Sequence, residues 1–335
     1  MISQAATTLQ RSSWRSALAD LVTSPQELFE MLSLSPSQDW DLGSEKKPFP
    51  LRVPREFVQR MRPGDPDDPL LRQVLPLQAE SERTSGYSLD PLAEITAEAT
   101  PGLLQKYRGR ALLVLTGVCA IHCRYCFRRH FPYADSSVGS HHLAETMSAL
   151  AADQSISEVI LSGGDPLMLG DDYLRDCVKR LESMPHLTRL RIHTRLPIVI
   201  PSRVDDEMLA WLSGTRFNTV IVVHVNHANE LDGSVASALA ALDKVGVTLL
   251  NQAVLLKGVN DNVEALQNLS IRLFENKVLP YYLHLLDKVQ GAAHFDVDEA
   301  TARQLIEAVR AQLPGYLVPR LAQEVAAQPA KMVLA

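Results

Sequence analysis

The strongest constraint on the fold is a regular alternation of two kinds of segment from residue 110 onward. Six short stretches rich in β-forming residues recur there, at 111–116, 158–161, 190–193, 219–224, 247–254 and 278–285. Amphipathic stretches with apolar residues at helical spacing follow them, at 142–152, 172–184, 205–212, 235–245, 263–274 and 299–313. This alternation predicts an α/β protein built from parallel βα units. Six such units form either an open doubly wound sheet or a partly closed barrel, and the pattern fits both.

Residues 1–95 have a different pattern from the rest of the chain. Apolar residues recur at helical spacing at 13–21 and 25–34, and Ser24, Pro25 and Glu27 together suggest a capped helix start. Proline-rich breaks follow at 47–50 and 62–69. We therefore expect a helical N-terminal extension over 1–95, wrapped on the main body by loops.

Composition narrows the class of function. Hydrophobic residues make up 46% of the chain and charged residues 21%, which is typical of a soluble globular protein. We find no apolar run of about 18 residues and no basic-then-apolar start of a secretory signal, so we expect a cytoplasmic protein without a membrane span. The formal charge of −6 gives no general attraction for nucleic acid or an anionic membrane. A small polar substrate is favoured.

Three of the four cysteines, Cys119, Cys123 and Cys126, follow the first predicted strand with the spacing C-x3-C-x2-C. In a reducing compartment they would serve as thiolates for a soft metal rather than as disulfides. A Cys3His zinc site would recruit His122 or His130 and act as a closed structural staple. A [4Fe-4S] cluster held by three cysteines would instead keep one iron open to a substrate or cofactor. The spacing alone allows both.

Polar residues gather after the predicted strands, where parallel βα proteins place their chemistry. They are the three cysteines, Ser162-Gly163-Gly164-Asp165, Thr194-Arg195, His224-Val225-Asn226-His227, Gln252 and Asp287. The glycine pair would let the backbone approach a ligand closely. The fourth cysteine, Cys177, lies among Leu174, Val178 and Leu181 at helical spacing, so we expect it in the core.

The cysteine spacing, with Tyr125 before the last cysteine, is similar to the signature of the radical S-adenosylmethionine (SAM) superfamily. The loop at 162–165 resembles the superfamily's loop that receives the methionine amino group. This resemblance implies a partial (β/α)6 TIM-like barrel over 96–315, with a [4Fe-4S] cluster on Cys119, Cys123 and Cys126 and SAM on its open iron. The residues implied to contact SAM are Ser162, Gly163, Gly164, Asp165, His224 and Gln252. Arg195 is a further candidate at a strand end, with no assigned role.

Four more segments together resemble the lysine 2,3-aminomutase family of that superfamily. They are Lys106-Tyr107-Arg108-Gly109-Arg110, Cys126-Phe127-Arg128-Arg129, Tyr281-Tyr282-Leu283-His284-Leu285-Leu286-Asp287 and Gly315-Tyr316-Leu317-Val318-Pro319. The resemblance runs from about residue 54 to residue 331. It implies an isomerase that uses SAM and pyridoxal phosphate to move an amino group from the α to the β carbon.

The family's substrate contacts carry over where the residues match. Arg128 would hold the substrate carboxylate with its planar guanidinium fork, whereas Arg129 is expected to be a surface arginine. Asp287 and Glu324 would hold the distal ammonium of lysine. The family more usually has aspartate at the second of these positions.

The pyridoxal phosphate contacts carry over in the same way. Lys331 would be the catalytic lysine whose amine binds the cofactor, in a C-terminal segment over 316–335. Lys106, Tyr107 and Arg110 would bind its phosphate. One departure is that Ala326-Ala327-Gln328-Pro329-Ala330 replaces the family's glycine run before the lysine.

The chain has no cysteine after Cys177 and ends four residues beyond Lys331, which resembles one bacterial branch of the family. That branch supplies (R)-β-lysine for modifying translation elongation factor P. The resemblance implies L-lysine as substrate, a flavodoxin- or ferredoxin-type electron donor, and a separate ligase that attaches the product. Two alternatives are an aminomutase for another amino acid, such as glutamate, and a zinc-binding module without catalysis.

Overall fold

The computed structural model describes residues 13–41, 43, 49–134, 136–326 and 328–335. The polar N-terminal start, part of the proline-rich break at 47–50, and Ala327 lie outside the described residues. No helix in the described residues is long and apolar enough to cross a membrane.

The six predicted strands all form, and they pair side by side in chain order as one parallel sheet. Their bounds are β5 (Arg110–Thr116), β6 (Glu158–Gly163), β7 (Arg189–Thr194), β8 (Asn218–Val223), β9 (Thr248–Val254) and β10 (Leu279–His284). Every residue of β6 is buried, as expected for a strand in the middle of a parallel sheet that is covered on both faces.

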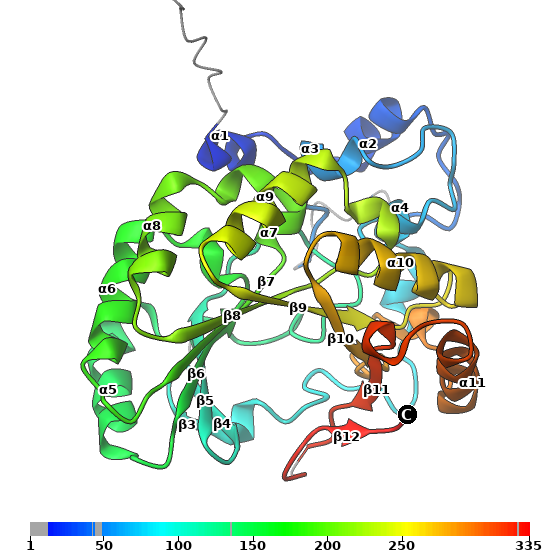
Figure 1. The fold of residues 1–335 in the computed structure, drawn as a ribbon. Helices are drawn as coiled ribbons and strands as arrows, with labels where there is room; N and C mark the ends of the chain where they lie inside the picture. Colours follow the sequence, from blue (N-terminus) through cyan, green and yellow to red (C-terminus); the bar gives the residue numbers. More distant parts are fainter. Residues whose placement is uncertain (1–12, 42, 44–48, 135, 327) are drawn as a thin grey trace, which may run out of the picture.

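The sheet is larger than the six predicted strands and it stays open (Figure 1). β11 (Arg320–Gln323) pairs parallel to β10, and β12 (Met332–Val333) returns antiparallel to β11. At the other side β4 (Leu103–Tyr107) and β3 (Glu98–Thr100) add two antiparallel strands. Within the described residues the strand order ends at β12 and β3, and these two strands do not pair with each other. The predicted partial barrel is therefore confirmed, and its sheet does not close into a full barrel.

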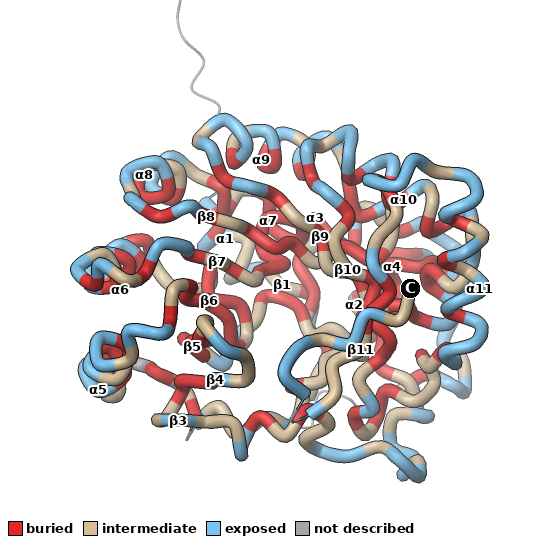
Figure 2. The backbone as a smooth tube through the Cα atoms, turned by 60° about the horizontal axis from the view of Figure 1, so that its bottom comes forward, coloured by how far each residue is buried: buried red, intermediate tan, exposed pale blue. Residues whose placement is uncertain are grey.

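Six helices lie outside the sheet, with their buried residues turned toward it (Figure 2). They are α5 (Gly139–Ala152), α6 (Asp171–Glu182), α8 (Asp206–Gly214), α9 (Gly233–Lys244), α10 (Val263–Glu275) and α11 (Glu299–Arg310). Four of them begin at an acidic or amide residue whose side chain accepts from a backbone amide: Asp205, Asp232, Asn262 and Asp298. Cys177 of α6 is fully buried in the core, as predicted.

The N-terminal extension is made of short elements. They are α1 (Trp14–Ala19), β1 (Leu21–Val22), α2 (Pro25–Leu32), β2 (Val53–Pro54), α3 (Arg55–Val58) and α4 (Pro69–Arg72), followed by single 3-10 turns. Ser24 occupies the N-cap of α2 but its side chain makes no capping bond, and Glu27 pairs with Arg55 instead of closing a capping box. The extension shares one hydrophobic core with the barrel. The proposed boundaries at 95 and 315 stay predictions.

Candidate active site

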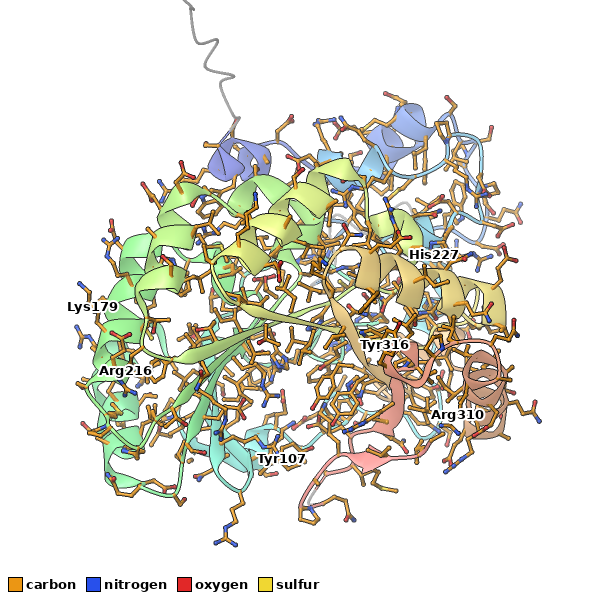
Figure 3. All side chains as sticks on the ribbon, viewed as in Figure 1. Tyr107, Lys179, Arg216, His227, Arg310 and Tyr316 are labelled. Atoms are coloured by element: carbon orange, nitrogen blue, oxygen red, sulfur yellow. The ribbon has the colours of Figure 1, made fainter. Side chains whose placement is uncertain are left out.

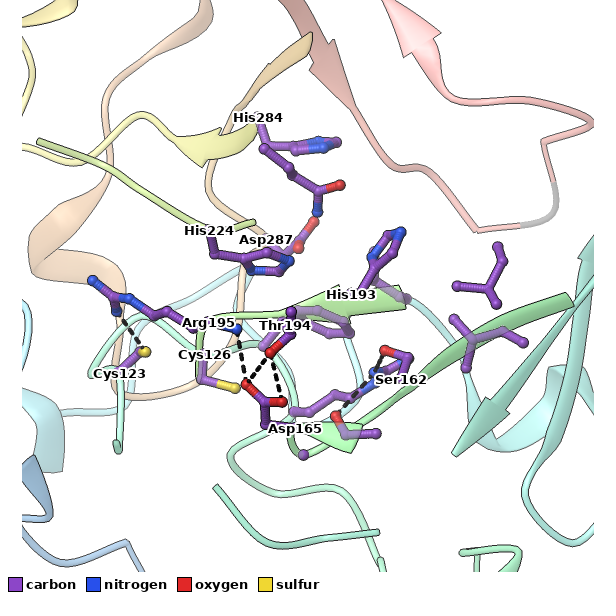
Figure 4. Close-up of a pocket in the computed structure, with 18 of the residues that line it drawn as sticks. Cys123, Cys126, Ser162, Asp165, His193, Thr194, Arg195, His224, His284 and Asp287 are labelled. Atoms are coloured by element: carbon purple, nitrogen blue, oxygen red, sulfur yellow. Dashed lines mark hydrogen bonds between the residues drawn. The ribbon is translucent and has the colours of Figure 1, made fainter. Parts of the chain in front are cut away.

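One cavity is lined by residues along the parallel strands and at their carboxyl ends, and it collects the side chains that the sequence singled out (Figure 4). Its lining includes Lys106, Tyr107, Arg110, Cys119, Cys123, Cys126, Arg128, Ser162, Gly163, Gly164, Asp165, Arg195, His224, Gln252, Asp287, Glu324 and Lys331. These residues come from segments more than 200 positions apart in the chain. Their individual roles stay predictions.

The loop after β5 carries the three cysteines and is fixed by the end of β6. Gly164 N donates to Thr116 O at 2.6 Å, and Asp165 N donates to Val118 O at 2.9 Å. A Cβ on Gly163, which has φ +123°, would lie 2.4 Å from Thr116 O. The glycines therefore let two backbones meet, and this contact places the cysteine loop against the cavity.

The surroundings of the cysteine loop favour a bound metal centre. Burial, with a smaller contribution from the neighbouring sulfurs, raises the pKa of the Cys119 thiol and raises that of Cys126 to about 11. Such thiols need a bound cation to become thiolates. His122 donates to Pro50 O and His130 to Gln290 O, at 2.9 and 3.1 Å.

Asp165, which follows β6, forms hydrogen bonds to residues at the end of β7. Its carboxylate accepts from the Thr194 hydroxyl at 2.7 Å and from the backbone amides of Leu167, Arg195 and Leu196. Burial raises its pKa, and these donors partly offset that rise. The carboxylate holds the loop at 162–165 in shape, beside its predicted role in binding SAM.

Arg128 is locked in place by a residue that the sequence reasoning missed. Its Nε and Nη2 donate to the two carboxylate oxygens of Glu94 at 2.6 and 2.8 Å. Its Nη1 donates to the Ser162 hydroxyl and to Gly163 O, at 3.1 and 3.2 Å. Burial alone would raise the pKa of Glu94, but Arg128 and Lys106 outweigh burial and lower it. Glu94 precedes the first strands in a loop with no recognisable motif, so no sequence signal marked it.

A network of ion pairs connects Glu94 to Lys331. Lys106 Nζ lies 2.8 Å from both Glu94 and Glu324, and Lys331 Nζ lies 2.9 Å from the other oxygen of Glu324. Burial would raise the pKa of Glu324, but Lys331 and Lys106 hold it at about 2. Tyr107 and Arg110 lie beside this network on the β4–β5 hairpin. Lys106 and Lys331, predicted to bind pyridoxal phosphate, therefore share the carboxylate of Glu324, predicted to bind the substrate. Figure 3 shows Tyr107 near the lower edge of the molecule.

Asp287 lines the same cavity just beyond the end of β10. Burial raises the pKa of its carboxyl to about 7, and the nearby negative charge of Glu324 adds to the rise. Near neutral pH this group therefore changes between a neutral acid and a carboxylate.

Three histidines line the cavity: His284, which is buried, and His193 and His224, which are half-buried (Figure 4). In each ring the Nε2 atom has no hydrogen-bond partner within the described residues. Burial lowers the pKa of all three, that of His224 to about 4, so they are neutral at physiological pH. Of the three, only His224 was predicted to contact a cofactor, because the family resemblance assigned no role to His193 or His284.

One expectation about the cysteine loop is wrong. Arg129 is not a surface arginine, because its side chain is 6% exposed and its Nη2 lies 2.6 Å from Glu80. Glu80 also pairs with Arg124, and both arginines pack over the Phe49 ring. The acid that buries these arginines lies in the N-terminal extension, more than 40 residues away, so the local basic pattern could not reveal it.

Comparison with known proteins identifies the class first. A model of the radical SAM superfamily matches residues 113–269, which contain the cysteine loop and most of the parallel strands, so the chain is a radical SAM protein. L-Lysine 2,3-aminomutase of Escherichia coli K12 is 49% identical, over 98% of this chain and 96% of the relative. The enzymes of that name from Haemophilus influenzae Rd and Clostridium subterminale are 47% and 31% identical, over 97% and 91% of this chain and 96% and 74% of the relatives. The chain belongs to the lysine 2,3-aminomutase family.

Family membership confirms the predicted enzyme class, an isomerase, and the predicted cofactors: a [4Fe-4S] cluster, SAM and pyridoxal phosphate. It also removes the zinc-binding module as an alternative.

Proposed function

We propose that this enzyme converts L-lysine to (R)-β-lysine. The observation that carries the proposal is a pair of carboxyl groups, Asp287 and Glu324, in the same cavity as the buried Arg128. Two acids suit the distal ammonium of lysine, and an arginine fork suits its carboxylate. The relatives named L-lysine 2,3-aminomutase support the same substrate.

Each cofactor has a proposed set of contacts. Cys119, Cys123 and Cys126 hold the cluster, Ser162, Gly163, Gly164, Asp165, His224 and Gln252 contact SAM, and Lys106, Tyr107, Arg110 and Lys331 contact pyridoxal phosphate. When bound, the cluster and SAM supply a radical that removes a hydrogen atom from the substrate, and pyridoxal phosphate supplies a carrier for the migrating nitrogen.

The protein's own charges suggest how lysine enters. Glu324 is paired with Lys331 and Lys106. With Lys331 holding pyridoxal phosphate, the oxygen of Glu324 that pairs with Lys331 would be available to the substrate ammonium.

Glu94 keeps the Arg128 guanidinium fixed from one edge. On the other edge, the substrate carboxylate would replace the Ser162 hydroxyl and Gly163 O as the partner of Nη1.

Glutamate is the competing substrate. Its side-chain carboxylate would face Asp287 and Glu324, and like charges at close range oppose binding. Lysine is therefore favoured.

We further infer that the product is used to modify translation elongation factor P, which would place the enzyme in the cytoplasm. A separate ligase would attach the β-lysine, and a flavodoxin- or ferredoxin-type protein would supply the electron. Coverage of 96% of the Escherichia coli relative and the Gln328-Pro329-Ala330-Lys331 sequence support this branch.

The test is chiral analysis of L-lysine incubated anaerobically with the reduced enzyme, SAM and pyridoxal phosphate. (R)-β-Lysine should accumulate, and L-glutamate in a parallel incubation should stay unchanged. The (S) product would refute the stereochemical assignment, and turnover of glutamate without lysine would refute the substrate. Adding ligase and elongation factor P should then give a protein mass increase of one β-lysine.

A further inference from the structure

Arg195 reaches a cysteine of the loop from the neighbouring strand. It follows β7 directly and is buried. Its Nη1 donates to Cys123 Sγ at 2.8 Å and to the Tyr125 hydroxyl at 2.7 Å (Figure 4). In the part of the chain that the structure describes, no other charged side chain is seen to donate to a cysteine sulfur.

Two further residues bind the other terminal nitrogen of the Arg195 guanidinium and hold it in place beside Cys123 Sγ. Arg195 Nη2 donates to Gln73 Oε1 at 2.6 Å and to Glu230 Oε2 at 2.8 Å. Glu230 is fully buried, and its other oxygen accepts from the Gln73 amide and from the backbone of Asn226, at 3.1 and 2.9 Å. A cation fixed by four partners cannot swing into solvent when the charge beside it changes.

We propose that Arg195 raises the reduction potential of the iron–sulfur cluster through its hydrogen bond to Cys123. In the reduction step one electron arrives from the reducing donor, no bond forms or breaks, and the cluster with its thiolates gains one negative charge. Hydrogen bonds to cluster sulfurs and nearby charge are among the factors that set such potentials. In a buried site a fixed cation favours the more negative state strongly. Arg195 is thus a positioning and electrostatic residue, and the inference rests on the proposed role of Cys123 as a ligand.

A purely structural role for Arg195 is the competing explanation, because the same side chain also holds Tyr125 and Gln73. Four variants separate the two. Arg195→Gln removes the charge, Arg195→Lys keeps a charge without the fork, and Tyr125→Phe removes a neighbouring hydroxyl without changing charge. Lys179→Gln removes a positive charge from the exposed outer side of α6 (Figure 3) and is the matched control.

The experiment measures iron content and the midpoint potential of each anaerobically reconstituted protein by spectroscopic titration. We expect Arg195→Gln to keep its iron and to show about a ten-fold lower ratio of reduced to oxidised cluster at a fixed applied potential, equivalent to about 59 mV for one electron. Arg195→Lys should fall between this variant and the parent. Tyr125→Phe should shift less than Arg195→Gln, and Lys179→Gln should match the parent.

An unchanged potential in Arg195→Gln or Arg195→Lys with full iron would overturn the proposal. Loss of iron from both Arg195 variants would do the same, because it would show a structural role. Cys123→Ser tests the ligand separately. If that variant keeps a full cluster, the ligand assignment fails; if it loses the cluster while Arg195→Gln keeps its potential, only the present inference fails.

Discussion

At the scale of single residues, we expect the proposed substrate contact Asp287 to make lysine binding depend on pH. Its carboxyl has a pKa raised to about 7, first by burial and then by Glu324. A raised pKa keeps an acid neutral below that value, and a neutral acid cannot pair with an ammonium. We therefore expect kcat/KM for lysine to rise with pH through about 7.

The Asp287→Asn variant should lose the rise of kcat/KM with pH near 7, and it should bind lysine more weakly. Removing one partner of a buried charge pair costs about 2 kcal/mol or more, which corresponds to a roughly 30-fold loss in kcat/KM. Kinetics with lysine across a pH series measure both effects. Asp172→Asn, at a side chain 94% exposed, is the control. A variant that kept the rise near pH 7 would assign it to another group.

Lys331 should be the lysine that pyridoxal phosphate labels. Borohydride reduction of the enzyme with the cofactor fixes the bond between them, and peptide mass spectrometry locates it. Lys331→Arg should abolish the label. Lys288→Arg, which changes an exposed lysine shortly after β10, should keep it. A label on Lys106, which lies on the same Glu324 carboxylate, would reverse the two assignments.

At the scale of elements, the C-terminal strands explain why Glu324 and Lys331 stand seven residues apart. Glu324 directly follows β11, and Lys331 directly precedes β12, which pairs antiparallel with β11. The two side chains meet because the chain turns back on itself between them. The seven-residue interval therefore reflects a β-hairpin. This hairpin brings Glu324 and Lys331 together without the glycine run that precedes the lysine elsewhere in the family.

The junction of β6 with the cysteine loop gives a second prediction at this scale. Gly163→Ala would place a Cβ 2.4 Å from Thr116 O. We expect it to lower stability by about 1–3 kcal/mol and to reduce iron content, because overpacking would push the loop away. Gly246→Ala has positive φ but open space around it, so it controls for backbone strain alone. Thermal unfolding and iron analysis compare the two, and equal losses would refute the role of the contact.

At the scale of the whole molecule, the N-terminal extension binds the cysteine loop through hydrogen bonds and an ion pair. His122 N donates to Arg52 O and Arg124 N donates to Gln73 O, each at 2.9 Å, and Glu80 pairs with Arg124. Any ordering of the loop by a bound cluster should therefore reach the extension.

Hydrogen exchange measures this coupling. Loading the cluster should slow exchange over residues 49–81 as well as over the loop, because a ligand that binds the folded state stabilises the elements packed on its site. Exchange in α6 should change little. Protection confined to residues 117–133 would show that the extension is independent of the cluster.

Strand and helix periodicity are local properties of the chain, so they were enough to predict the alternating strands and helices of the barrel. The cysteine spacing and the resemblance to the lysine 2,3-aminomutase family supplied the candidate site residues, and the structure shows that these residues line one cavity. The sequence pattern missed β3, β4, β11 and β12, because each is short and is fixed by its neighbour in the sheet rather than by a periodic pattern of its own. It also gave no sign of Glu94 as the partner of Arg128, or of Glu80 as the acid that buries Arg129. Only the tertiary structure decided these pairings, because a charge is buried or paired according to what the fold brings beside it.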